Sequence, residues 1–482
     1  MNFKLSKTRK PHKLSYKGII IEPQIRDFFA GRIWTRYNTP FPQSKVDTYI
    51  LRNYFTTKKG ITIRTKVLIF QRTHFTCNRC QNKIQQEFVQ YTCAKCEKEC
   101  VYCRHCLNMG RVTSCTDLIS WIGAKPLTHK KHLLDWNGTF TEAQKEAATQ
   151  LVSSIKQKRN HLNHAVCGAG KTEILFPAVH YALNRGLRVC IATPRTDVVL
   201  ELFPRFQKVF PKTNIHALYG KAPKQTGFAQ LVISTTHQLF RFENAFDVII
   251  VDEADAFPYT YDQALQKAVH KVKKQDAPVA LVTATPSPQI LAKQKKEKWG
   301  YSFIPKRYHG HPLPIPRYES LWSYDKAIQK GRIPRKLREW TNEKLSNQEP
   351  FLIFFPTIQL MEQAIPLFQQ LDERILSVHA EDTDRKEKVM KLRNEQILGL
   401  LTTTILERGI TIKNVQVAVV GAESKIFTSS ALIQISGRVG RNAAFPKGDI
   451  VFFHHGITAE MDEARNEIFR LNKEGFGKNE TP

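Results

Sequence analysis

The sequence lacks long apolar runs, and no stretch approaches the roughly 18 residues that a membrane-spanning helix requires. It also lacks the hydrophobic segment of a secretory signal peptide, because the apolar residues after the basic N-terminus end at Glu22 and Pro23. Low-complexity tracts and short-period repeats are absent as well. We therefore expect a cytoplasmic protein built from ordinary globular domains.

Acidic residues are scarce relative to basic ones. The 482 residues include 43 Asp and Glu against 73 Lys and Arg, which gives a formal net charge of +30. Such an excess attracts polyanions, so nucleic acid is the leading candidate partner. A hydrophobic content of 41% excludes wholesale disorder, and the length suits two to four domains.

Basic charge is concentrated in residues 1–76, where 16 Lys and Arg face 3 acidic residues. Aromatic residues are interleaved with these cations, so the region offers charges for phosphates and rings for unpaired bases. The alternative is a solvated basic face over an ordinary aromatic core. We favour contact with nucleic acid. The aromatic residues concerned are Phe28, Phe29, Trp34, Tyr37, Phe41, Tyr49, Tyr54 and Phe55.

Cysteine is confined almost entirely to one segment, because eight of the ten cysteines lie between residues 77 and 115, mostly in C-x-x-C pairs. Thiolates at this spacing are typical ligands of tetrahedral Zn²⁺, and eight suffice for two structural Cys₄ sites. An iron–sulfur cluster and redox disulfides are the alternatives. Cys167 and Cys190 stand apart and are expected to be inert, without metal. The candidate ligands are Cys77, Cys80, Cys93, Cys96, Cys100, Cys103, Cys106 and Cys115.

From residue 137 onward, short apolar stretches alternate with longer helical segments, which predicts an α/β fold with parallel sheets covered by helices. Thr141 is a good N-cap for the first of these helices. A proline-rich connector at 310–318 separates two such blocks. We therefore predict four parts: a basic aromatic region (1–76), a cysteine module (77–136), a first α/β lobe (137–306) and a second α/β lobe (307–482).

The stretch AVCGAGKTE at 165–173 follows a predicted strand and precedes a predicted helix. Small residues there let backbone N–H groups face phosphate oxygens, while Lys171 would reach the β and γ phosphates and Thr172 would ligate Mg²⁺. The alternative is a tight strand-to-helix turn without a ligand. The predicted phosphate loop comprises Gly168, Ala169, Gly170, Lys171 and Thr172.

The stretch VDEADAFP at 251–258 places acidic residues at the end of the apolar strand DVIIV, where ligands bind in open α/β sheets. Asp252 suits Mg²⁺ coordination, and Glu253 suits a base that orients the attacking water. Alone, the motif is also typical of a solvated turn. Together with a phosphate loop in the same sheet, it predicts metal-assisted phosphoryl transfer.

In the second block, QISGRVGR at 434–441 places Arg438 and Arg441 three positions apart, which predicts that they share a helical face. Arginines presented from a separate lobe stabilise charge on a γ-phosphate and contribute ~10³ to 10⁵ in rate in related enzymes. The alternative, a solvated basic helix, leaves the flanking glycines unexplained.

Read in order, eight stretches resemble the motifs of superfamily 2 helicases between residue 137 and about residue 460. They are TEAQ, AVCGAGKTE, ATPRTDVV, ISTTHQL, VDEADAFP, TATP, TTTILERGI and QISGRVGR. The stretches AVCGAGKTE, ATPRTDVVLEL, TTTILERG and GAESKIFTSSAL further resemble the ComFA family, the late-competence DNA-uptake ATPases of transformable Gram-positive bacteria. The resemblance implies two tandem RecA-like lobes that bind ATP between them.

The resemblance also implies roles for individual residues. Gln144 would read adenine, with Phe140 as a weaker candidate to pack on the ring, and Thr283 and Thr285 would couple hydrolysis to movement of the lobes. The nucleic-acid backbone would be held, without base readout, by Arg195, Thr235, Thr236, Thr403 and Thr404. The cleft between the lobes, near the nucleotide, would be lined by Glu407, Arg408 and Gly409.

For the cysteines, spacing alone would join the pair at 77 and 80 to the next pair, at 93 and 96. The resemblance instead implies one site made of Cys77, Cys80, Cys103 and Cys106. The remaining cysteines of the module would then form a second site, and the two sets would interleave along the chain.

The resemblance favours an ATP-driven translocase or helicase on single-stranded DNA that serves DNA uptake during natural transformation, with ATP, Mg²⁺ and Zn²⁺ as cofactors. It implies work at the inner face of the cell membrane beside the uptake channel, with a ComFC-like competence protein as partner. One alternative is a superfamily 2 DNA or RNA helicase in repair or remodelling. The sequence DEAD at 252–255 favours this alternative. Another is a zinc-bearing adaptor with an inactive nucleotide site.

Overall fold

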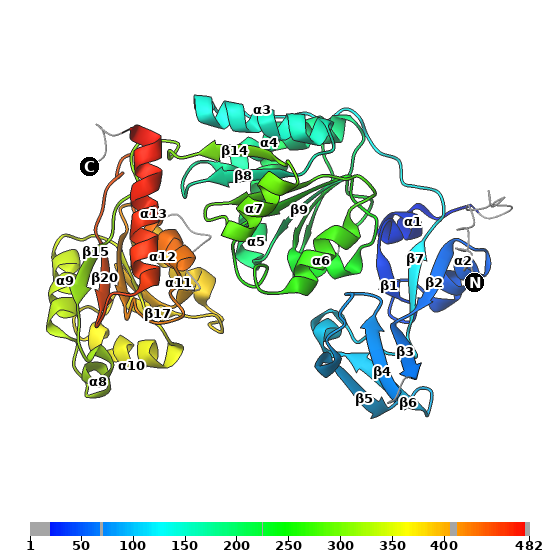
Figure 1. Cartoon of the computed structure of the whole chain (residues 1–482), viewed down its shortest axis with the longest axis horizontal. Helices are drawn as coiled ribbons and strands as arrows, with labels where there is room; N and C mark the ends of the chain where they lie inside the picture. The colour runs from blue at the N-terminus through cyan, green and yellow to red at the C-terminus, as the bar shows by residue number, and fades with distance from the viewer. Residues whose placement is uncertain (1–19, 68–70, 224, 405–411, 478–482) are drawn as a thin grey trace.

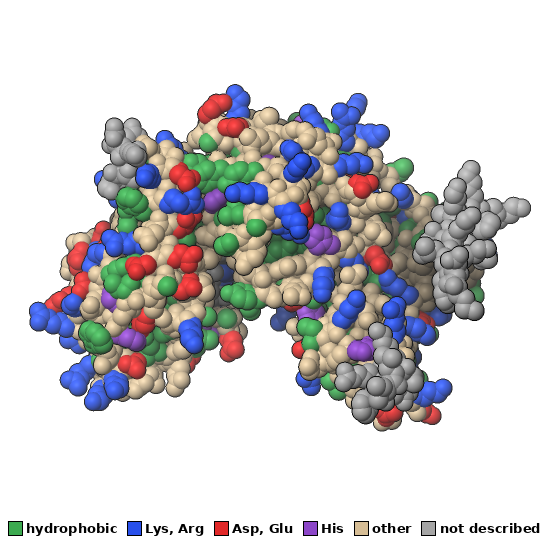
Figure 2. Space-filling model, in the orientation of Figure 1, with side chains coloured by type: hydrophobic (Ala, Val, Ile, Leu, Met, Phe, Trp, Pro, Cys, Tyr) green, Lys and Arg blue, Asp and Glu red, His purple; other side chains and the backbone are tan. Residues whose placement is uncertain are grey.

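The computed structural model describes residues 20–67, 71–223, 225–404 and 412–477. Lobe 1 lies between lobe 2 on one side and the N-terminal unit with the cysteine module on the other (Figure 1). The outline is indented below lobe 1, between lobe 2 and the cysteine module, on the face that Figure 2 shows. No helix among the described residues is long and apolar enough to cross a membrane.

Lobe 1 is a parallel sheet with strand order β10-β11-β9-β12-β13-β8-β14, covered by helices. Its central strands are buried along their whole length, which explains their continuous apolar sequences. The strands are β8 (His161–Ala165), β9 (Val189–Thr193), β10 (Ile215–Leu218), β11 (Leu231–Thr235), β12 (Val248–Asp252), β13 (Val279–Thr283) and β14 (Gly300–Ile304). The helices are α3 (Glu142–Lys156), α4 (Lys171–Asn184), α5 (Thr196–Val209), the 3₁₀ helix η3 (Thr236–Arg241), α6 (Gln263–Val272) and α7 (Pro288–Lys296).

The start of α3 confirms the predicted N-cap. The Thr141 hydroxyl accepts a hydrogen bond from the Gln144 N–H, and the Gln144 side chain accepts one from the Thr141 N–H. This capping box satisfies two N–H groups that the first helical turn leaves unpaired, at a gain of about 1 kcal/mol. It also fixes the Gln144 side chain close to the loop before α4.

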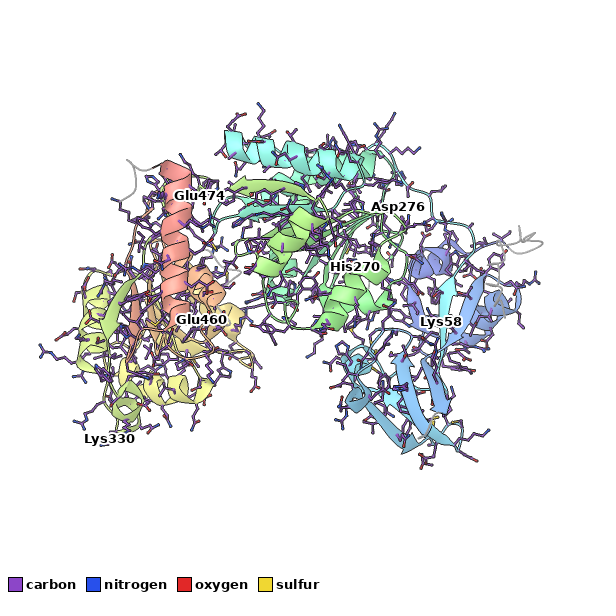
Figure 3. The ribbon with its side chains drawn as sticks, viewed as in Figure 1. Lys58, His270, Asp276, Lys330, Glu460 and Glu474 are labelled. Atoms are coloured by element: carbon purple, nitrogen blue, oxygen red, sulfur yellow. The ribbon has the colours of Figure 1, made fainter. Side chains whose placement is uncertain are left out.

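Lobe 2 is a second parallel sheet, with strand order β15-β20-β19-β16-β18-β17. Its long C-terminal helix carries Glu460 and Glu474 near its two ends (Figure 3), and Asn472 on it bonds both backbone groups of Leu313 in the connector. The strands are β15 (Arg317–Ser320), β16 (Phe351–Phe354), β17 (Ile375–Val378), β18 (Gly399–Thr402), β19 (Gln416–Val420) and β20 (Ile450–His454). The helices are α8 (Tyr324–Gln329), α9 (Arg335–Ser346), α10 (Ile358–Gln369), α11 (Arg385–Arg393), α12 (Ser429–Ser436) and α13 (Ala459–Phe476).

The N-terminal unit contains α1 (Pro23–Phe29), α2 (Gln43–Leu51) and an antiparallel sheet ordered β1 (Ile33–Thr35), β7 (Asp117–Trp121), β2 (Phe55–Lys59). Strand β7 follows the cysteines in the chain, so the sheet takes strands from both sides of the boundary predicted at residue 77. The aromatic residues of this region differ in burial. Buried in the core are Phe29, Tyr49, Tyr54 and Phe55, while Phe28, Trp34 and Phe41 are half-buried and Tyr37 is exposed.

The eight cysteines lie in an insertion between β2 and β7, residues 60–116, and this insertion is called the cysteine module from here on. It contains the hairpins β3 (Ile61–Val67) with β4 (Gln71–Cys77) and β5 (Phe88–Thr92) with β6 (Glu99–Cys103), and the 3₁₀ helices η1 (Gln85–Glu87) and η2 (Arg104–Met109).

Polar contacts attach the N-terminal unit and the cysteine module to lobe 1. Lys58 lies on β2 (Figure 3), and its ammonium is 2.9 Å from the Glu243 carboxylate. His105 lies 3.0 Å from Asp262. The buried Lys271 ammonium donates to the Arg79 carbonyl at 2.5 Å. These contacts attach the N-terminal unit and the cysteine module to lobe 1.

Candidate functional site

A cavity of about 640 Å³ lies between the two lobes. Its lining includes each residue that the sequence predicts to be catalytic and nearly all of those predicted to bind nucleotide. The predicted residues that line it are Gln144, Gly168, Gly170, Lys171, Thr172, Asp252, Glu253, Arg438 and Arg441. Ala169, predicted with them, is fully buried next to the cavity.

The loop between β8 and α4 forms the floor of the cavity. Strand β8 ends at Ala165, and α4 begins at Lys171. Gly168 and Gly170 have φ angles of 82° and 75°, which a residue with a Cβ atom adopts at a cost. The turn directs the N-terminus of α4, with its unpaired N–H groups, at the cavity, which suits an anion.

Gln144 ties α3 to this loop, because its side-chain nitrogen donates to the Ala169 carbonyl at 2.8 Å. The adenine-reading role that the resemblance assigns to Gln144 stays a prediction. Aromatic rings next to it also line the cavity: Trp136 and Phe140 have ring centroids 4.5 Å apart. The cavity therefore has a phosphate-binding part and an aromatic part suited to a base.

Asp252 ends strand β12 and is buried, with 7% of its surface exposed. Burial, and secondarily the neighbouring Glu253, raises the pKa of Asp252 to about 7, while Lys171 lowers it. A buried carboxylate that lines the same cavity as the Thr172 hydroxyl fits a hard divalent cation, whose charge would favour the ionised form.

Arg438 and Arg441 reach the cavity from lobe 2, but the reason predicted for their placement is wrong. Helix α12 ends at Ser436, so both arginines belong to the following turn, residues 437–441, which we call the arginine turn. Arg441 Nε donates to the Gly437 carbonyl at 2.8 Å. A Cβ atom on Gly437 would lie 2.5 Å from the Cβ of Cys167, so this glycine allows the arginine turn to pack on the phosphate loop.

Burial first, and then Arg441, lowers the pKa of Arg438, while Glu253 raises it. Arg438 therefore interacts electrostatically across the lobes with the acidic residue predicted to activate water. This places charge from lobe 2 where negative charge develops in phosphoryl transfer.

Arg307 and Tyr308 are site residues that the sequence did not reveal. The buried Arg307 guanidinium donates to the carbonyls of Val439 at 3.0 Å and Gly440 at 2.5 Å. The Tyr308 N–H donates to the Gly168 carbonyl at 3.0 Å, and Tyr308 lines the cavity. These residues lie at the boundary between the predicted lobes, where no periodic pattern or motif draws attention to them.

Hydrogen bonds connect the lobes beside the cavity. The Thr285 hydroxyl lies 2.5 Å from the Asp255 carboxylate and 2.7 Å from the Ser430 hydroxyl of α12. Gln434, also on α12, donates to Asp255 at 3.1 Å and accepts from the Cys167 thiol at 3.0 Å. Cys167 was expected to be inert, and it instead bridges the phosphate loop to lobe 2.

Another predicted coupling residue, Thr283, is buried and accepts a hydrogen bond from the Thr285 N–H at 3.1 Å. Cys190 lies in β9, where burial raises its pKa to about 12, in keeping with an unreactive thiol.

The residues assigned to the nucleic-acid backbone lie in both lobes. Arg195 pairs with Asp197 at 2.7 Å, and Asp197 also pairs with Arg385 of lobe 2 at 3.1 Å. Thr235 and Thr236 are buried at the carboxyl end of β11, whereas Thr403 and Thr404 are half-buried after β18. Their role stays a prediction. The predicted cleft residues Glu407, Arg408 and Gly409 lie outside the described residues.

The module's cysteines form two groups, in each of which the sulfur atoms lie within 4.8 Å of one another. Sulfur pairs such as Cys77–Cys106 and Cys80–Cys103 are 3.6 and 3.7 Å apart, far beyond a disulfide length. Zn–S bonds of ~2.3 Å in a tetrahedron place sulfurs about 3.8 Å apart, so the arrangement fits zinc. The groups are Cys77, Cys80, Cys103, Cys106 and Cys93, Cys96, Cys100, Cys115.

These groups interleave along the chain, as the resemblance implied and spacing alone did not. In the first group, the Asn82 side chain lies 3.7 Å from the Cys103 sulfur as a donor. Arg79 donates to the Cys106 carbonyl at 2.8 Å and the Met109 carbonyl at 3.0 Å, which fixes the segment that carries the last cysteine of this group.

Known families match three parts of the chain. Residues 14–120 match the competence protein ComFA N-terminal domain, residues 137–288 match the type III restriction enzyme res subunit, and residues 334–443 match the helicase conserved C-terminal domain. The first match spans the basic region and the cysteine module together, which the sheet of β1, β7 and β2 joins.

Two relatives are similar over most of their length. The competence protein ComFA of Bacillus subtilis is 41% identical over 450 residues, which cover 93% of this chain and 95% of the relative. The competence protein ComFA of Streptococcus pneumoniae is 37% identical over 400 residues, which cover 83% and 90%.

Two solved structures share the fold of the two lobes. Dbp5 of S. cerevisiae bound to RNA and ADP BeF3 has a TM-score of 0.53 at 18% identity and covers 71% of this chain and 89% of that one. The helicase Lhr of Mycobacterium smegmatis bound to ssDNA and AMP-PNP has a TM-score of 0.50 at 16% identity and covers 70% and 50%. The two parallel sheets thus have the RecA-like fold.

Proposed function

Because the chain belongs to the ComFA family of competence proteins, we propose that it is a motor that pulls single-stranded DNA during DNA uptake. Its helicase domains make it an ATP-hydrolysing enzyme of superfamily 2 that uses ATP and Mg²⁺. Single-stranded DNA as substrate, its translocation, and its uptake in natural transformation are the parts that we propose.

The observation that carries the proposal is the cavity shared by both lobes. Lys171 and the N-terminus of α4 bind phosphates from lobe 1, and Arg438 and Arg441 line the same cavity from lobe 2. Glu253 orients the attacking water and accepts its proton, while the arginines stabilise the charge that develops on the γ-phosphate. Hydrolysis then changes how strongly the two lobes attract each other.

Asp252 and Thr172 are the oxygen ligands that the chain offers to Mg²⁺. When bound, the ion neutralises charge between the β and γ phosphates. The high pKa of Asp252 follows from its burial, and a neighbouring divalent cation would keep this carboxylate ionised at neutral pH.

The hydrogen bond between Thr285 and Ser430 and the one that Gln434 donates to Asp255 support coupling between hydrolysis and movement. They join the segment after the catalytic carboxylates to α12, whose C-terminal end leads into the arginine turn. In this proposal, a change at the γ-phosphate shifts α12 against lobe 1 and moves lobe 2 along the strand.

The two groups of cysteines hold one Zn²⁺ each in this proposal. Because all four positions of each ion are filled by thiolates, the metal is structural and supports the fold of a module with a small core. The protein works in the cytoplasm, at the inner face of the membrane beside the uptake channel, with a ComFC-like competence protein as partner.

ATP turnover measured with single-stranded DNA, duplex DNA and RNA tests the proposal. We expect turnover to rise with single-stranded DNA and much less with RNA. Lys171→Ala should lower turnover by about 10²-fold or more while leaving strand binding intact, because it removes a phosphate contact and no strand contact. Equal stimulation by RNA would favour the RNA helicase alternative, and unchanged turnover in the variant would contradict the ATP site.

A further inference from the structure

A second cavity, of about 670 Å³, lies between lobe 1, the N-terminal unit and η2 of the cysteine module. We call it the basic aromatic groove. One wall is the segment from Phe28 to Phe41, and the other comprises the end of β10, residues 219–223 and 225–227, and the end of η3. The groove is separate from the cavity that holds the catalytic residues, because the two share no lining residue.

The groove carries positive charge without compensation. Its described lining includes Arg32, Lys221 and Arg241 and no Asp or Glu. Within the described part of the chain, no carboxylate forms an ion pair with either guanidinium. Besides burial, which lowers the pKa of both arginines, Arg241 lowers the pKa of Arg32 and Arg79 lowers that of Arg241. Burial first, and then Arg241, lowers the pKa of Arg32 to about 10, so an anion in the groove would relieve an existing repulsion.

Aromatic rings lie beside these cations. The Arg32 guanidinium carbon is 4.4 Å from the Phe28 ring centroid, and that of Arg241 is 4.9 Å from the Trp34 ring centroid. Phe28 also contacts Trp34 and Phe41, with centroids 5.2 and 5.4 Å apart. All three rings are half-buried, so each keeps surface on which a base can stack.

The groove lies close to the residues of lobe 1 that are predicted to hold the nucleic-acid backbone. Helix η3 begins at Thr236, which the family resemblance assigns to the nucleic-acid backbone, and ends at Arg241 in the groove. At ~2 Å per residue, the six residues of η3 cover about 12 Å. This distance corresponds to about three stacked nucleotides, at ~3.4 Å each.

We propose that the basic aromatic groove binds unpaired bases of single-stranded DNA, next to the segment held by the lobes. Phe28, Trp34 and Phe41 stack on the bases, and Arg32, Lys221 and Arg241 contact the phosphates. The choice of strand rests on the proposed function, whereas the groove itself is independent of the ATP site. The N-terminal unit thus adds a second grip that moves with lobe 1.

The test compares a groove variant with a control of equal charge. Lys221→Glu with Arg241→Gln changes the net charge by −3. So does the control, Lys45→Gln on α2 with Arg52→Glu at the C-cap of that helix, both outside the groove. The reagent is a fluorescent 20-nucleotide oligo-dT, titrated at several salt concentrations. We expect the groove variant to raise Kd by about tenfold or more and to flatten the salt dependence by ~0.7 per lost phosphate contact, with little change in the control.

Equal Kd values for the groove variant and the control would overturn the proposal. Photo-crosslinking of the wild-type protein to 5-iodouracil oligonucleotides gives a second test that needs no variant. Crosslinks at Phe28, Trp34 or Phe41 are expected, and crosslinks confined to other residues would overturn the proposal.

ATP turnover separates this result from the motor itself. If the groove is wrong and the motor right, the groove variant keeps its Kd and single-stranded DNA still stimulates turnover. If the motor is wrong and the groove right, single-stranded DNA leaves wild-type turnover unchanged, although its binding depends on the groove residues.

Discussion

Replacing Arg307 with alanine tests how the chain holds the arginine turn against the phosphate loop. The Arg307 guanidinium is 1% exposed and donates to the carbonyls of Val439, Gly440 and Pro446 at 3.0, 2.5 and 2.9 Å. Alanine leaves these acceptors without that donor, at about 1–3 kcal/mol each. Water entering the space replaces part of the loss, so we expect the free energy of unfolding to fall by about 3–6 kcal/mol.

The larger effect should be on catalysis. Arg438 and Arg441 flank the carbonyls that Arg307 holds, and a misplacement of about 1 Å at a reacting centre costs ~10²-fold in rate. We therefore expect kcat for ATP to fall about 10²-fold at saturating single-stranded DNA, with a smaller change in KM. Urea unfolding and steady-state kinetics at a temperature where the variant is folded measure the two effects.

The matched control is Arg317→Ala, which removes an ion pair to Asp449 at 3.0 Å on the surface of lobe 2. Its guanidinium is half exposed, so we expect less than about 1 kcal/mol of stability and no change in kcat. Arg307→Lys keeps the charge but not the fork of donors, and should recover only part of the rate. A folded Arg307→Ala protein with wild-type kcat would refute the reasoning.

Other predictions address the metal sites, the buried histidines and the lobe contacts. Cys77→Ser should lower the zinc content from two ions per chain to one and destabilise the cysteine module while both lobes keep their urea transitions; unchanged metal content would contradict the assignment. Burial lowers the pKa of His161 to about 4 from its ordinary 6.5, so the stability it contributes above pH 6.5 is lost as the pH falls towards 4, by about 2 kcal/mol at pH 5. His161→Asn should therefore show a shallower loss of urea stability between pH 7 and 5, and an equally steep loss would count against this. Thr285→Val removes the hydroxyl between Asp255 and Ser430 and should slow displacement of streptavidin from a biotinylated strand more than it slows ATP turnover. Equal loss of both rates would argue against a coupling role.

The fold was predictable where the residues of a segment determine its secondary structure locally. Central strands such as β12 are buried on both faces, so their apolar sequences are continuous, and Thr141 marks a helix start through its own hydroxyl. The lobe strands β10, β14 and β15 are harder to recognise in the sequence. Each of these lies at the edge of its sheet, where one side stays unpaired and the sequence is shorter or more polar.

The site residues also fall into two groups, those that a local motif reveals and those that depend on distant contacts. The phosphate loop and the acidic residues are local motifs, so the sequence alone identifies them. Arg307 and Cys167 act through partners more than 100 positions away, Val439 and Gln434, and no local pattern records such contacts. Arg438 was predicted for its chemistry, but where α12 ends depends on how the glycine at 437 packs on lobe 1.

The pairing of β2 with β7 makes the cysteine module removable in principle. Lys59 and Asp117 are opposite one another in that ladder and their side chains lie 2.9 Å apart, although 57 residues separate them in the chain. A two-residue Asn-Gly turn could therefore replace everything between them without disturbing the sheet. The module is an insertion between two paired strands. Comparing the shortened chain with the full one would measure what the metal centres contribute to the motor.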